Sequence, residues 1–124
     1  MTDQLRQLQR LAPVLNSVFL AEQSKLAGIN ARIEGLKEQL RSLDRKHELQ
    51  LHDPAIRAGA DMRWRTWVQD RRTLINREIL SLKRQRLDIK QRVAKALSRL
   101  EACKSLVEKT QAEADALRAR RRVD

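Results

Sequence analysis

The chain has 124 residues, a formal net charge of +11, 35% charged residues and only three aromatic side chains. This composition supplies too little bulky apolar material for the core of a compact globular domain, whereas a long two-stranded coil needs only a thin apolar stripe. The longest uncharged run, residues 11–21, is too short and too polar to span a bilayer, and no secretory signal is recognisable, so a cytoplasmic protein is expected.

A first helix is predicted over about residues 3–51, with Thr2 or Asp3 as its cap. Its apolar residues recur at alternating spacings of three and four, the heptad pattern that keeps one stripe facing a partner helix. This stripe, called the seam below, comprises Leu5, Leu8, Ala12, Leu15, Phe19, Glu22, Leu26, Ile29, Ile33, Leu36, Leu40 and Leu43. Pro13 interrupts the helical hydrogen bonds, and because the seam continues across it we expect a kink there.

A turn is predicted over residues 52–61, which read HDPAIRAGAD. Pro54 lacks a backbone donor and disfavours helix at the residue before it. Gly59 admits the backbone angles of a turn, and Asp61 can cap the helix that follows.

The second helix is predicted over about residues 62–121, with its own seam from Ile75 onward. The seam positions are Ile75, Ile79, Leu82, Arg86, Ile89, Val93, Ala96, Leu100, Cys103, Val107, Thr110, Ala114 and Leu117. If this helix runs back along the first, facing residues have numbers that add to about 115, which pairs Ile33 with Leu82. The predicted fold is all-α: one long antiparallel two-helix coiled-coil hairpin over residues 1–124.

Two further expectations follow from this register. Gly28 and Gly35 would face Leu87 and Leu80, so that small residues accommodate large ones, although tolerated surface glycines are the alternative. Thr110 and Ala114 offer little apolar area, so the seam should weaken after Val107 and leave the end of the second helix poorly covered.

The positive charge is concentrated in the second helix. Residues 62–124 contain eighteen basic and eight acidic side chains, against eight and six in residues 1–51. Such a surface attracts acidic partners, which include nucleic acid, an anionic membrane surface and an acidic protein.

Catalytic and metal-binding patterns are missing from the sequence. There is no glycine-rich phosphate loop, no Cys/His quartet and no nucleophile beside a base, so we expect neither an enzyme nor a cofactor. His47, Glu48, His52 and Asp53 form the one metal-like group, at spacings that match no known site. The single cysteine, Cys103, is expected to pack in the seam as a small apolar group.

Residues 58–79 carry a family resemblance. Ala58 and Gly59 in the turn are followed by Arg63 and Trp64, an aromatic residue three positions later at Trp67, and the apolar stretch Leu74 to Ile79. In the order of these residues, the sequence resembles the flagellar FliJ family and its type III secretion relatives of the YscO type. The chain length, the two long helices around a central turn and the basic character extend this resemblance over most of the chain. It departs from the flagellar members in having Arg45 and Leu49 where they often have aromatic residues.

The resemblance implies a function without chemistry. Members act as the stalk of a hexameric export ATPase at the cytoplasmic face of the inner membrane, and they also contact the export gate membrane protein and export chaperones. The ATPase ring would then be contacted by the start of the first helix and by Arg118, Arg120, Arg121 and Arg122. The gate or a chaperone would be faced by Arg63, Trp64, Trp67 and Leu74. No small-molecule substrate is implied.

Two alternatives of other classes remain open from the sequence. The basic second helix fits a nucleic-acid-binding coiled coil, although it lacks an aromatic array for stacking bases. A structural scaffold that only dimerises is the other alternative. For the tryptophans, packing at the end of the seam is the alternative to a partner surface, where Trp and Arg are favoured.

Overall fold

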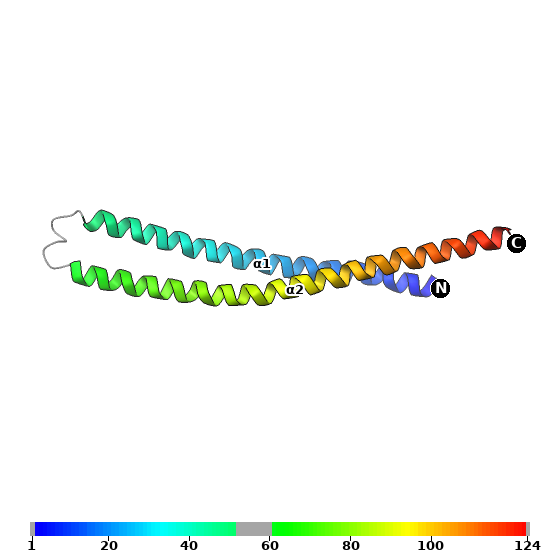
Figure 1. The fold of residues 1–124 in the computed structure, drawn as a ribbon, viewed down its shortest axis with the longest axis horizontal. Helices are drawn as coiled ribbons and strands as arrows, with labels where there is room; N and C mark the ends of the chain where they lie inside the picture. Colours follow the sequence, from blue (N-terminus) through cyan, green and yellow to red (C-terminus); the bar gives the residue numbers. More distant parts are fainter. Residues whose placement is uncertain (1, 52–60, 124) are drawn as a thin grey trace. The chain divides into compact units, whose positions relative to one another are not determined.

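The computed structural model describes residues 2–51 and 61–123, with the side chains of residues 3–46 and 62–123. It contains two α-helices, α1 (Thr2–Leu51) and α2 (Asp61–Val123), which pack against each other as a helical hairpin (Figure 1). The predicted all-α fold is therefore confirmed, and both helices begin and end within two residues of the predicted positions. Asp61 is the first residue of α2, while the rest of the predicted turn, residues 52–60, lies outside the described residues.

The hairpin divides into two compact units, and each pairs a segment of α1 with a segment of α2. The central unit comprises Ala27–Asp88, and the terminal unit comprises Met1–Leu26 and Ile89–Asp124.

The core of the central unit is the predicted seam. Ile33, Leu36, Ile75, Ile79 and Leu82 form one buried cluster, with Ile29 and Leu40 packed against it. Ile33 and Leu82 are 1% and 2% exposed, as expected for residues that share a layer of the seam. All twelve predicted seam positions of α1, in both units, are buried or half-buried, so the heptad pattern identified the inward face of this helix without error.

Polar contacts between the helices confirm the antiparallel register of the central unit. Arg32 donates to Glu78 at 3.0 Å and Arg86 donates to Asn30 at 3.3 Å, while Arg72 donates to Asp44. The residue numbers in these pairs add to between 110 and 116, close to the predicted 115. Arg86 occupies a predicted seam position, and Arg72 lies three residues before Ile75, where the seam spacing continues. Both are half-buried and extend to a partner beside the stripe.

In the terminal unit the seam continues further than expected. Thr110 and Ala114 are buried, at 8% and 9% exposure, so the prediction that the seam weakens after Val107 is wrong by two turns. For Thr110 this agrees with the register, because Leu5 lies at its matching position on α1 and is itself buried. Beyond Ala114, residues 115–123 of α2 are all exposed, so the end of this helix is uncovered as predicted.

Cys103 occupies its predicted place in the seam of the terminal unit. It is buried as a free thiol, and its sulfur lies 3.5 Å from the backbone oxygen of Leu8 on α1. Pro13 lies inside α1, which begins at Thr2, so the proline does not mark a helix end. The Ser17 hydroxyl donates to the Pro13 carbonyl oxygen at 3.0 Å.

The expected role of the glycines is wrong. A Cβ atom added at Gly28 or Gly35 would meet nothing within 4 Å, and the proposed partners Leu87 and Leu80 are 65% and 52% exposed. Both glycines therefore lie on open helix surface. The seam beside them is filled by leucine and isoleucine side chains and needs no leucine from outside it. Within residues 2–51 and 61–123, neither helix has a stretch long and apolar enough to cross a membrane.

Candidate functional site

Trp64 and Trp67 lie on one side of α2, near its first turns. Because they are three residues apart on a helix, their rings come together, and the ring centroids are 5.2 Å apart with 24° between the planes. The seam position beside them is filled by Val68, which is 1% exposed, whereas Trp67 is 51% exposed. The tryptophan pair is thus not the core of the unit but a stacked aromatic surface at its edge.

The stacked pair forms one wall of a surface depression of about 300 Å³ between α1 and α2. Its floor contains the seam residues Leu43 and Ile75, and its rim is polar. The lining residues are Gln39, Ser42, Leu43 and Lys46 of α1 and Trp64, Trp67, Arg71 and Ile75 of α2. An apolar floor with a cationic rim suits an apolar side chain carried by an acidic partner.

Trp67 also borders a second depression, which lies on α2 alone. Its lining residues are Met62, Arg63, Thr66, Trp67 and Asp70. The structure therefore brings Arg63, Trp64 and Trp67 together. Leu74 is exposed two turns further along α2 and lines neither depression.

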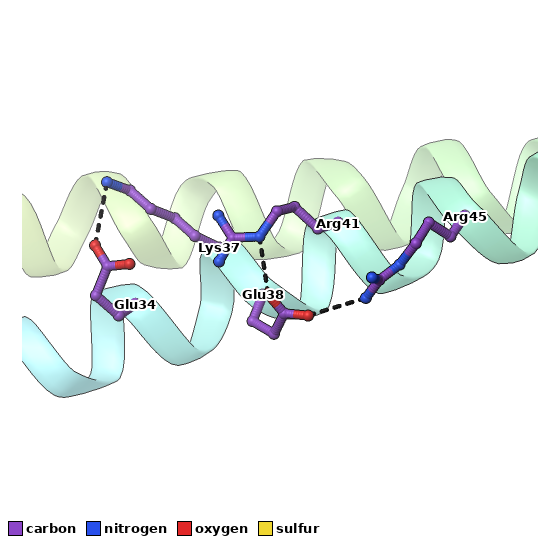
Figure 2. A network of polar contacts seen from close by, with 5 residues as sticks. All are labelled: Glu34, Lys37, Glu38, Arg41 and Arg45. Carbon is purple, nitrogen blue, oxygen red and sulfur yellow. Dashed lines mark hydrogen bonds and ion pairs between the residues drawn. The ribbon is translucent and has the colours of Figure 1, made fainter.

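Two carboxylates on α1 of the central unit, Glu34 and Glu38, are occupied by neighbours on the same helix (Figure 2). Glu38 accepts from Arg41 at 2.8 Å and from Arg45 at 2.9 Å, and Glu34 lies 3.6 Å from Lys37. The hydrogen bond and charge of Arg41, with a smaller effect of Arg45, lower the pKa of Glu38 below its ordinary value. Arg63 and Arg71, beside the tryptophans, form no ion pair with any described residue, so their charges are available to a partner.

The second predicted site is the basic end of α2, in the terminal unit. Arg118, Arg120, Arg121 and Arg122 are all exposed and lie beyond Ala114, where the seam ends. Cations in the last turn of a helix interact favourably with its dipole, which helps to keep this end helical. None of the four forms an ion pair within the described part of the chain.

Several residues that line the depression beside Trp64 and Trp67, called the tryptophan site below, were not predicted from the sequence. Val68 and Arg72 extend the spacing of three and four backward from Ile75, and this signal would have placed Trp64 and Arg71 at the flank of the seam. The contributions of Gln39 and Lys46 could not be found in the same way, because they require the partner helix and its register.

Metal binding gains no support from the described residues. Among them, no three His, Cys, Asp or Glu side chains are close enough to hold a metal ion. The group His47, Glu48, His52 and Asp53 lies outside the described side chains.

Comparison with known proteins adds no evidence on function. No family model, curated protein or solved structure matches this chain.

Proposed function

We propose that this protein is the non-catalytic stalk subunit of a type III protein export ATPase, of the flagellar or the injectisome branch. The proposal starts from the resemblance of residues 58–79 to the FliJ and YscO-type proteins. The observation that carries it is the exposed basic end of α2, where Arg118 to Arg122 extend beyond the last covered seam residue.

A stalk must present a helix end that its own partner helix does not cover, and residues 115–123 meet this requirement. In the proposed complex this end enters the centre of the hexameric ring, and its four arginines meet acidic groups of the ring. A single asymmetric coil can contact only some subunits at a time, so it would favour one arrangement of the ring and couple its conformational changes to export. The protein needs no reaction of its own for this role.

The tryptophan site would serve the other set of partners, the export gate and the export chaperones. Trp67 is exposed, Trp64 stacks on it, and the rings are flanked by Arg63 and Arg71, which form no ion pair with any residue that the structure describes. Aromatic and arginine side chains around an apolar depression are the composition of binding hot spots. Leu74 would extend the same contact along α2. The proposed location is cytoplasmic, at the membrane face of the export apparatus.

The ATPase assay is the primary test. Adding the purified full chain to the export ATPase of the same organism is expected to increase hexamer formation and ATP hydrolysis. A variant lacking residues 115–124 should lose this effect and keep its helix content, because the covered seam ends at Ala114. The matched control is Lys83→Gln with Arg84→Gln, which removes two exposed cations from the central unit and should leave the stimulation unchanged.

The same material separates the nucleic-acid alternative. A nucleic-acid-binding coil would retain unrelated DNA with an affinity that falls steeply as salt rises, because bound counterions are released from the phosphates. Retention of DNA at physiological salt together with no stimulation of the ATPase would reject the stalk proposal.

A further inference from the structure

The terminal unit exposes apolar side chains that are not part of its seam. Among them are Leu11, Val14 and Val18 on α1 and Leu106 on α2, which have exposed fractions between 44% and 57%. The three residues of α1 follow one another at spacings of three and four, so they form a second stripe on one side of that helix. They also lie in the uncharged run of residues 11–21.

The heptad positions place these side chains on one flank of the unit. Leu11 and Val18 directly precede the seam residues Ala12 and Phe19, and Leu106 directly precedes Val107. In an antiparallel pair, residues that precede equivalent seam positions lie on the same side of both helices. The ion pair of Arg32 and Glu78, which precede Ile33 and Ile79, shows this relationship in the central unit.

The opposite flank of the terminal unit is identified independently. Gln9 and Asn16 of α1 and Lys104 of α2 each directly follow a seam residue, and all three line one depression beside Pro13. These positions therefore share the other side of the coil. Leu11, Val18 and Leu106 belong to the remaining flank, where two-stranded coils normally place charged residues.

This apolar flank is bordered by cations of α2. Arg99 directly precedes Leu100 and so lies on the same flank. Along α2, Lys95 lies one turn before Arg99, and Lys109 lies one turn after Leu106. All three are exposed, and none forms an ion pair with a described residue. Within the described part of this unit, one carboxylate of α2 directly precedes a seam residue as Arg99 and Leu106 do. It is Glu113, which lies two turns beyond Leu106.

We propose that this flank is a docking surface for an amphipathic helix of another protein, whose apolar stripe covers Leu11, Val14, Val18 and Leu106 and whose edge carries carboxylates. The flank complements such a helix in two ways. Its aliphatic stripe matches the apolar stripe of the helix, and its cationic border, which has no acidic neighbours along most of its length, matches the carboxylates. A second copy of the chain is a poor occupant, because a symmetric contact would bring the Arg99 borders of two copies together. The inference uses none of the residues assigned to the ATPase ring or to the gate, so it stands or fails separately from the proposed function.

The test measures binding of a synthetic helical peptide to the full chain by fluorescence anisotropy. The peptide is about three heptads long, with leucine in one stripe and glutamate along one edge. The wild-type chain is expected to bind it, and Leu11→Ser with Val18→Ser should weaken binding by at least about tenfold. Arg99→Glu with Lys95→Glu should weaken it to a similar degree and reduce its dependence on salt, since the contact between opposite charges is screened by ions.

Two controls make the result specific. Leu20→Ser removes an exposed leucine of α1 on the other side of the helix and should leave the affinity unchanged. A peptide with lysine in place of each glutamate should not bind. Circular dichroism is expected to show the same helix content for all variants, because every substituted side chain is exposed.

Three outcomes would overturn the inference. The first is equal binding of the glutamate and lysine peptides, and the second is equal loss with Leu20→Ser. The third is occupation of the flank by something else: self-association in analytical ultracentrifugation that Val18→Ser abolishes, or binding to vesicles of anionic lipid that Val18→Ser abolishes.

Discussion

Val68 and Trp67 are neighbours in the chain with opposite environments: Val68 is 1% exposed and Trp67 is 51% exposed. The smaller residue fills the seam, and the larger one stacks on Trp64 at the surface. Val68→Ala is therefore expected to reduce the free energy of unfolding by about 2 kcal/mol, because it removes buried methyl groups and leaves a cavity. Trp67→Ala should reduce it by less than about 1 kcal/mol.

Urea unfolding followed by circular dichroism measures both changes. Val18→Ala, at an exposed position of α1, is the matched control for the loss of methyl groups and should have little effect. If Trp67→Ala proved more costly than Val68→Ala, the tryptophans would belong to the core, and the gate or chaperone surface would have to be abandoned.

Gly28→Ala and Gly35→Ala are each expected to stabilise the protein by about 0.5–1 kcal/mol. A methyl group at either position meets nothing within 4 Å, and glycine in a helix interior costs more conformational entropy than alanine. Thermal unfolding of the single variants and the double variant is the measurement. Destabilisation by either change would show that a leucine of α2 does approach the glycine, contrary to the exposed positions of Leu80 and Leu87.

Glu22 is the one acidic residue of the seam, and we expect its replacement by leucine to stabilise the hairpin. One carboxylate oxygen lies 3.3 Å from Lys25, but the other is buried and has no hydrogen-bond partner among the described residues. A buried unsatisfied polar group costs about 1–3 kcal/mol, so Glu22→Leu should raise the free energy of unfolding by a comparable amount. Glu22→Gln separates the effect of the charge from that of the polar group, since it removes the charge and keeps a polar group in place. A loss of stability in the leucine variant would contradict the prediction.

The sequence was sufficient for the fold because one repeated spacing specifies it. A stripe that returns every three or four residues fixes the inward face of each helix, and two such stripes around a turn fix the pairing of Ile33 with Leu82. The errors occurred where burial depends on neighbours in space. Thr110 and Ala114 have little apolar area but are buried, whereas Leu80 and Leu87 are large but lie outside the seam.

The candidate site was predictable only in part, for the same reason. Arg63, Trp64 and Trp67 were expected from the family resemblance and from the composition of binding hot spots, which favours tryptophan and arginine. The α1 side of the depression, with Gln39 and Lys46, has no signal of its own in the sequence. It becomes part of the site only through the register between the two helices.

The register itself can be tested with a disulfide. Ile33→Cys with Leu82→Cys, in a chain that also carries Cys103→Ser, is expected to form an intramolecular disulfide on mild oxidation, since both side chains are buried in one cluster. Mobility on a non-reducing gel, with peptide mapping, identifies the bond. Ile33→Cys with Leu80→Cys is the control, because Leu80 is exposed outside the seam and should crosslink poorly. Crosslinks found only between chains in dilute solution would mean that the helices pair between two copies.

The last prediction concerns the acid range and Glu38. Arg41 and Arg45 lower the pKa of its carboxyl in the folded chain, so the folded state favours the ionised form more than the unfolded state does. The stability that this provides is present above the ordinary pKa of a glutamate and is lost as pH falls through the lowered value. Carboxyl chemical shifts from NMR titration should show Glu38 titrating below an ordinary glutamate, and Arg41→Gln with Arg45→Gln should return it to the ordinary range. Lys37→Gln, which removes the partner of Glu34 on the preceding turn, is the control and should leave the Glu38 titration unchanged. An unchanged titration in the double arginine variant would instead show that the network of Figure 2 does not persist in solution.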